Sequence, residues 1–235
     1  NRYITRLGKG SFGGKGRGMA FLSNFIENVD LKKLIPNLKI EIPKTAIIGS
    51  DEFDNFIENN NLTSIIYSDK TYDEVKAAFV ASPLPSSLKS KLRSFLEIIT
   101  KPLAVRSSGL FEDSLGQPFA GVYSTYLIPN NHPDFERRVE ELENAVRLVW
   151  SSIYTDSSKA YFNAIDSMIE EEKMAVIVQE VIGNEYNGKY YPNISGVAQS
   201  FNFYPFSYIK PEDGFAVIAL GLGAYVVGGE KTHRF

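Results

Sequence analysis

Apolar residues recur along the chain with the two periods that distinguish helices from strands. Apolar side chains three or four positions apart predict helices at residues 16–26, 50–57, 71–79, 88–99, 134–150 and 161–168. Short apolar runs between turn residues predict strands at residues 39–42, 46–48, 64–67, 103–105, 121–127 and 174–182. Helices and strands mixed in this order indicate an α+β domain.

Some of these segments carry a further local signal. Residues 71–74 read as a capping box, in which Thr71 and Glu74 satisfy amides at a helix start, and Ser50 is placed to cap the helix that follows it. We interpret the apolar stripe of residues 134–150 as core-facing, with a seam for a partner protein as the alternative. The acidic run 170–172 is interpreted as solvated surface, because consecutive helix positions do not face one metal ion.

The composition describes a globular chain without a strong overall charge. With 235 residues, of which 43% are hydrophobic, the chain can bury a substantial core. Its 25 Lys and Arg residues against 28 Asp and Glu residues give a net charge of −3, so no overall positive field favours nucleic acid or an anionic membrane as a partner. Any anion site must therefore be built locally.

Cysteine is absent and histidine occurs twice. The lack of cysteine removes disulfides and thiolate metal sites and fits a reducing cytoplasm. The apolar runs are far too short for a membrane-spanning helix, so we expect a soluble cytoplasmic protein. Because the chain opens at Asn1 without a methionine and stops at Phe235 after a basic cluster, we also expect a fragment of a longer protein.

The densest candidate chemistry follows the predicted strand 103–105. That strand ends at Arg106, Ser107 and Ser108, where a guanidinium and two hydroxyls can together hold phosphate or carboxylate. An arginine near carboxylates is also common in a plain salt-bridge cluster, and this interpretation stays open.

Acidic and small residues follow this strand end. Glu112 and Asp113 offer oxygens either to a divalent cation or to Arg106. Gly121 lets backbone approach a ligand closely, and Thr125 can present its hydroxyl from the next predicted strand. The segment therefore predicts a local anion site.

The first eighteen residues form a basic, glycine-rich segment. Five Lys and Arg residues and six glycines occur there without an acid, just ahead of the helix predicted from Gly16. We expect the loop to deliver amide groups and Lys15 to the helix N-terminus, where the macrodipole favours an anion. The segment matches neither a Walker A motif nor a dinucleotide fingerprint, and a flexible tail is the alternative.

Several segments together resemble one known family. The string VRSSGLFEDSLGQPFAGVYSTYL resembles the signature of the nucleotide-binding domain of phosphoenolpyruvate synthase and pyruvate phosphate dikinase. LGKGSFGGKGRGMAFL resembles the opening loop and helix of that family, and VIVQEVIG, SGVAQS and GLGAYVVGGE resemble its later segments. The motifs keep the family's order over residues 7–230, which makes the resemblance specific.

The resemblance implies an α+β fold of the ATP-grasp type, in which two lobes hold a nucleotide between them. Residues 1–172 would form the first lobe and residues 173–235 the start of the second, with the domain truncated at its C-terminal end. The ligand would be ATP with Mg²⁺. Its phosphoryl group would pass to a histidine on a separate domain of the parent chain and then to pyruvate, yielding phosphoenolpyruvate beside a PEP/pyruvate domain.

The resemblance also implies roles for individual residues. Lys15 and Arg106 would be the catalytic charges at the phosphates. Further neighbours of the phosphates or the metal would be Ser107, Gly121 and Thr125. The edge of the adenine would meet Gln179, Glu180 and Val181.

The chain also departs from the family pattern. Relatives commonly read SGVxFTxxP where this chain reads SGVAQSFNFYP, and Ala224 takes the place of a family glutamate. No segment before Phe235 matches the strand that completes the metal and phosphate site. Neither His132 nor His233 lies in a context that resembles a phosphohistidine segment, so the chain alone is expected not to make phosphoenolpyruvate.

Two other functions stay open. One is a module that senses nucleotide without turnover, and the other is a related phosphotransferase that acts on a glucan or a small drug. Both would keep Lys15 and Arg106. An acceptor histidine and a barrel-like pattern after Phe235 would favour the synthase or dikinase.

Overall fold

The computed structural model describes residues 3–30, 33, 35–109, 123–164, 173–205, 208–223, 226 and 233–234. The chain divides into two compact units, Asn1–Glu180 and Val181–Phe235. Helices and strands are mixed along the chain, so the predicted α+β class is confirmed.

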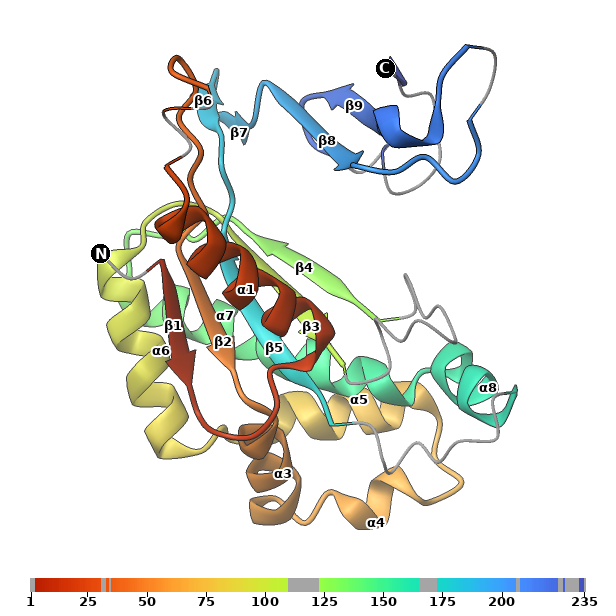
Figure 1. The fold of residues 1–235 in the computed structure, drawn as a ribbon. Helices are drawn as coiled ribbons and strands as arrows, with labels where there is room; N and C mark the ends of the chain where they lie inside the picture. Colours follow the sequence, from red (N-terminus) through yellow and green to blue (C-terminus); the bar gives the residue numbers. More distant parts are fainter. Residues whose placement is uncertain are drawn as a thin grey trace. The chain divides into compact units, whose positions relative to one another are not determined.

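The first unit is built on a five-stranded mixed sheet (Figure 1). In spatial order its strands are β1 (Ile4–Leu7), β2 (Thr45–Ile48), β5 (Ala175–Glu180), β3 (Leu103–Ser108) and β4 (Thr125–Ile128). β1 runs parallel to β2, and the other neighbouring pairs are antiparallel. The segment that we expected to open the second lobe thus supplies the central strand of the first unit.

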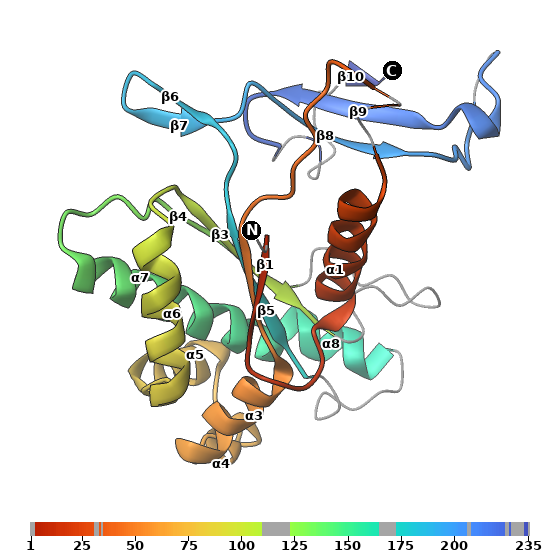
Figure 2. The ribbon, with the colours of Figure 1, turned by 60° about the vertical axis from the view of Figure 1, so that its left-hand side comes forward.

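Helices lie on both faces of this sheet (Figure 2). α6 (Ser86–Ile98) and α7 (Phe135–Ser151) lie on one face, and α1 (Gly13–Asn28) lies on the other. The remaining helical segments are α3 (Ser50–Asn59), α4 (Thr63–Ile66), α5 (Tyr72–Ala81), η1 (Ser152–Tyr154) and α8 (Asp156–Ala164). Within the described residues, every helix is too short or too polar to span a bilayer.

The hydrophobic core lies on the face covered by α6 and α7. Alternate residues of the inner strands are buried there, namely Ala46, Ile48, Leu103, Val105, Val176 and Val178. Trp150 of α7 packs against Phe53 and Phe56, with ring centroids 5.9 and 5.0 Å apart. Its indole N–H donates to the Met174 carbonyl at 3.2 Å, so this large side chain is buried without an orphaned donor.

The opposite face of the sheet is only partly covered. Neighbouring residues form a row across it from β2 to β4, namely Ile47, Ile177, Arg106 and Thr125. Ile47 is buried near α1, Arg106 is half-buried, and Thr125 is exposed. The row therefore leads from the apolar contact with α1 to a polar margin.

The second unit consists of small antiparallel sheets. β6 (Asn184–Tyr186) and β7 (Lys189–Tyr191) form a hairpin whose turn residues, Asn187 and Gly188, both have positive φ, at 51° and 74°. Such turns match the twist of paired strands. A second sheet joins β8 (Ile194–Gln199), β9 (Phe215–Leu220) and β10 (His233–Arg234), with η3 (Pro211–Asp213) before β9.

The structure corrects several local predictions. The capping box at Thr71 is confirmed, with both of its hydrogen bonds. The strand predicted at residues 64–67 is wrong, because residues 63–66 form α4, and residues 39–42 form no strand. Both are short apolar runs without a paired neighbour, which the apolar period alone cannot assign. β1 has too few apolar residues for the pattern to reveal it.

Candidate functional site

The glycine-rich loop between β1 and α1 is held against the start of α3. The Lys9 amide donates to Asp51 Oδ1 at 2.7 Å, and the Ser11 amide donates to Ser50 Oγ at 2.9 Å. In return, the Ser50 amide donates to the Ser11 carbonyl at 3.0 Å. The N-cap of α3 is Gly49, so the predicted capping role of Ser50 is wrong. Its hydroxyl orders the loop instead.

Two glycines allow this close packing. A Cβ on Gly49 would lie 1.8 Å from the Lys9 carbonyl oxygen, and a Cβ on Gly13 would lie 1.9 Å from the Ser108 carbonyl oxygen. Gly49 has an ordinary φ of −70°, so it is required for space alone. Gly13 also has a φ of +66°, which disfavours a side chain independently.

The first turn of α1 rests on the end of β3. The Gly14 amide donates to the Gly109 carbonyl at 3.2 Å, and the Gly16 amide donates to Ser108 Oγ at 3.0 Å. The Ser108 hydroxyl in turn donates to the Phe12 carbonyl at 2.7 Å. The glycine-rich segment and the VRSS segment, which the sequence treats as separate motifs, are thus in direct contact.

Lys15 lies at the centre of this contact. It is half-buried, and its Nζ lies 3.5 Å from the Ser107 carbonyl oxygen at the end of β3. Its two neighbours in α1 are the glycines whose amides donate to β3 and to the residue after it. Lys15 and Ser107, which the sequence names separately as site residues, are therefore brought together by the fold.

Arg106 occupies the same strand end as Ser108. Its register partners are Thr125 on β4 and Ile177 on β5, on the face of the sheet where α1 lies. Within the part of the chain that the structure describes, nothing accepts a hydrogen bond or forms an ion pair with its half-buried guanidinium. A half-buried cation of this kind can accept an anionic ligand, because no described residue occupies its donors.

Five backbone amides of the glycine-rich loop and of the first turn of α1 donate hydrogen bonds within the protein. Those of Lys9, Ser11, Gly13, Gly14 and Gly16 all donate within the protein, the Gly13 amide to Ser11 Oγ at 3.1 Å. These five amides therefore already have oxygen acceptors within the protein, and the anion site expected at the start of α1 stays a prediction.

The residues predicted at the adenine edge lie where the two units meet in sequence. Gln179 Nε2 donates to Thr45 Oγ1 at 3.1 Å and lies 4.0 Å from Met19 Sδ of α1. The Glu180 amide donates to the Lys44 carbonyl at 2.9 Å, and its carboxylate pairs with Lys101 at 2.9 Å. A base at this edge would therefore meet groups other than the Glu180 amide.

The Val181 carbonyl accepts from the Tyr190 hydroxyl at 3.1 Å. Gly121, Glu112 and Asp113 lie outside the described residues, as does Ala224. Among the described residues, no group of three or more carboxylate or histidine side chains could hold a metal ion. The structure thus describes the cationic part of the predicted site and leaves its acidic part undescribed.

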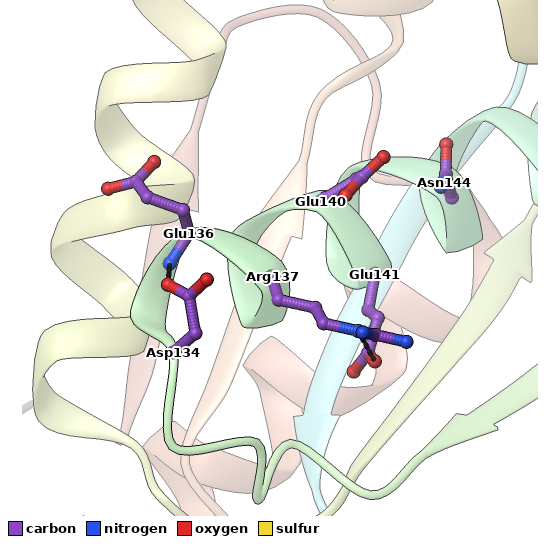
Figure 3. Close-up of a pocket in the computed structure, with 6 residues that line it drawn as sticks. All are labelled: Asp134, Glu136, Arg137, Glu140, Glu141 and Asn144. Atoms are coloured by element: carbon purple, nitrogen blue, oxygen red, sulfur yellow. Dashed lines mark hydrogen bonds and ion pairs between the residues drawn. The ribbon is translucent and has the colours of Figure 1, made fainter.

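A separate groove of about 440 Å³ lies on the outer side of α7 (Figure 3). Its lining residues are Asp134, Glu136, Arg137, Glu140, Glu141 and Asn144. The Arg137 guanidinium lies 3.9 Å from Glu141, and the Asp134 carboxylate accepts from the Glu136 amide as the helix cap. Four carboxylates around one arginine repel an anion, so this groove does not suit a phosphate ligand.

Sequence reasoning missed the structural roles of Asp51 and Ser108. The tripeptide Gly49-Ser50-Asp51 directly after a buried strand is a recognisable signal for a polar strand end. Ser108 was noted only as a possible ligand donor. Its contact with α1 joins positions 92 residues apart, which no local pattern reports.

Two comparisons with known proteins bear on this site. The family model for the AMP/ATP-binding domain of pyruvate phosphate dikinase matches residues 9–234. A curated protein of Bacillus subtilis (strain 168), the "Uncharacterized phosphotransferase YvkC", is 28% identical over 152 residues, which cover 63% of this chain and 17% of that protein. The chain thus matches a small part of this relative, and the match extends over most of its own length.

Proposed function

Because the chain belongs to the AMP/ATP-binding domain family of pyruvate phosphate dikinase, we propose that it binds ATP with the phosphates against Lys15 and Arg106 and acts as the phosphoryl-donor domain of a phosphotransferase. The proposed fold is of the ATP-grasp type, with the base near residues 179–181. The phosphotransferase named among its relatives supports the same class of reaction.

One observation carries this proposal. The fold brings Lys15 to the end of β3, with Nζ 3.5 Å from the Ser107 carbonyl, and Arg106 precedes Ser107 on that strand. Two cations from distant parts of the sequence therefore lie at the end of the same strand. Phosphoryl transfer depends on positive charge and alignment at the phosphates more than on a covalent protein group.

The remaining contacts are proposed from the family match, and of their residues Thr125 and Ser107 lie among the described residues while Gly121 does not. Thr125, which is exposed and in register with Arg106, is proposed as a phosphate or metal neighbour, together with Ser107 and Gly121. We propose Mg²⁺ as the accompanying ion, because this ion is usually held by substrate phosphates with only one or two carboxylates. Its carboxylate ligands are not assigned to described residues.

The proposed acceptor is a histidine on another domain of the parent protein, and pyruvate follows as the final acceptor. His132 Nδ1 accepts from the Asp134 amide at 3.0 Å, beside the start of α7. His233, in β10, is in register with Ile218 of β9. Neither histidine belongs to α1 or β3, which carry Lys15 and Arg106, so neither is proposed as the acceptor.

Calorimetry with ATP and Mg²⁺ tests the proposed binding site. Replacing a charged hydrogen-bond donor to phosphate should weaken binding, so we expect Arg106→Ala to raise the Kd for ATP about ten-fold. Arg93→Ala is the matched control, because Arg93 pairs with Glu136 on the opposite side of the sheet. Unchanged ATP affinity in a folded Arg106→Ala protein would contradict the assignment, and no ATP binding by the wild-type chain would contradict the function.

A further inference from the structure

We infer that Ser108 is a positioning residue, which holds the first turn of α1 on the end of β3 and so fixes Lys15 relative to Arg106. The inference rests on the proposed nucleotide site. It concerns a residue that is buried, with no exposed surface, and that acts through the two cations rather than on the ligand.

The Ser108 hydroxyl bridges two backbone groups of α1. It accepts from the Gly16 amide at 3.0 Å and donates to the Phe12 carbonyl at 2.7 Å. These two groups are four residues apart, which is the pair that an α-helix ordinarily joins directly. The α1 helix has no side-chain cap of its own at Phe12, so Ser108 supplies from β3 a contact that α1 lacks locally.

The contact constrains Lys15 from both sides. The Gly16 amide is held by the Ser108 hydroxyl, and the Gly14 amide is held by the Gly109 carbonyl. Because the backbone on each side of Lys15 is held by adjacent residues, the origin of its side chain has little freedom. The side chain itself reaches the Ser107 carbonyl.

Ser108 also fixes where Lys15 lies relative to Arg106. Arg106 and Ser108 are two positions apart on β3, so they share a face of the sheet and their Cα atoms lie about 7 Å apart. A shift of α1 along β3 would change the separation of Lys15 from Arg106 without altering either residue. Charge placement at a phosphate is sensitive to such shifts.

The site accepts few side chains other than serine. A Cβ on Gly13 would lie 2.5 Å from Ser108 Oγ, so the hydroxyl already fills the space beside the helix. Alanine would remove both hydrogen bonds and leave the Gly16 amide without this acceptor. Cysteine would keep a similar shape with much weaker hydrogen bonding.

A double-mutant cycle on ATP binding tests the inference. We expect Ser108→Ala to raise the Kd for ATP about ten-fold in the wild-type background, but less than about two-fold when Lys15→Ala is also present. If Ser108 only stabilised the fold, Ser108→Ala would raise the Kd by the same factor with and without Lys15→Ala. Equal ratios, or an unchanged Kd in Ser108→Ala, would overturn the inference.

Adenosine, which lacks phosphates, supplies a second readout. Its affinity should be the same in wild type and Ser108→Ala, and an equal loss for adenosine and ATP would overturn the inference. Ser151→Ala is the control, because Ser151 is equally buried and donates to the Leu148 carbonyl at 2.9 Å within α7. Ser151→Ala should leave ATP affinity unchanged.

If Ser108→Ala does not fold, Ser108→Cys replaces it in the double-mutant cycle. A loss of ATP affinity that depends on Lys15 supports the inference, and wild-type affinity in this variant overturns it. A wild-type chain that binds no ATP would contradict the proposed function itself. If the wild-type chain binds ATP and mutation of Ser108 leaves the Kd unchanged, only the positioning role is contradicted.

Discussion

Gly13 and Ser108 lie so close together that a Cβ on Gly13 would come within 1.9 Å of the Ser108 carbonyl oxygen. No rearrangement of a flexible side chain can relieve this contact, because the obstructing atom belongs to the backbone of β3. Since Gly13 also has a φ of +66°, both space and conformation exclude a side chain at this position.

We therefore expect Gly13→Ala to reduce the free energy of unfolding by more than about 2 kcal/mol. Gly18→Ala is the matched control in the same helix, because a Cβ there meets nothing within 4 Å. That change should be neutral or stabilise the protein by up to about 1 kcal/mol, since alanine is the better helix former. Urea unfolding of the two variants checks the pair, and equal stabilities would contradict the contact.

The bond between Asp51 and the Lys9 amide predicts a local effect on the loop. Asp51→Ala removes the acceptor, so the Lys9 amide should exchange with solvent about ten-fold faster or more. Asp51→Asn keeps an oxygen acceptor and should preserve most of the protection. Asp54→Ala breaks only the pair between Asp54 and Lys173 and should leave Lys9 unaffected. Exchange measured by NMR would contradict the contact if Lys9 behaved alike in all three variants.

The stability of the fold should depend strongly on the side-chain amide of Asn130. Its Nδ2 donates to the Ile99 and Lys101 carbonyls, and its Oδ1 accepts from Arg138 Nε at 2.9 Å. Asn130→Asp would replace the donor by an acceptor facing two carbonyls, which should cost more than about 2 kcal/mol of stability.

Asn61→Asp is the control for this change, because Asn61 and Asn130 have similar positive φ values, 52° and 51°, but Asn61 is exposed. Thermal and urea unfolding should show little change for Asn61→Asp. If Asn130→Asp were equally mild, the buried amide network would not contribute to stability as described.

The capping box predicts a pH-dependent contribution to stability. Hydrogen bonds from Lys70 and from the Thr71 amide hold the pKa of Glu74 below its ordinary value of 4.5. A lowered pKa in the folded state means that the contribution is present above the ordinary pKa and lost as the pH falls through the lowered value.

Glu74→Gln keeps an oxygen for the Thr71 amide but removes the charge. The difference in unfolding free energy between wild type and Glu74→Gln should therefore be present at neutral pH and vanish in strong acid. Glu58→Gln, at an exposed carboxylate, controls for the general loss of a charge. A difference that did not change with pH would show that the charge of Glu74 does not stabilise this helix start.

The parts of the fold that the sequence predicts are those with local causes. The capping box at Thr71 depends on residues three positions apart, and the apolar stripe of α7 repeats within one helix. The helix at residues 63–66 was mistaken for a strand because four residues carry too little periodicity to distinguish the two.

The sequence names the candidate residues of the site, but it does not predict the hydrogen bonds around them. Lys15 and Arg106 stand out because charge in a glycine-rich loop or at a strand end is visible in the sequence. The acceptors of the loop amides are not visible, because Ser50, Asp51 and Ser108 lie far along the chain and the bonds form only after the sheet has assembled.

The place of β5 in the sheet has a consequence for the order of folding. β2 and β3 have no direct pairing, since β5 lies between them, and β5 is the last of the five strands to be synthesised. A nascent chain that ends before Ala175 holds only the separate pairs β1–β2 and β3–β4, each with an open edge. Residues that meet across α1 and β3 therefore gain a stable frame only after β5 has been synthesised, and pairings between such distant segments form slowly.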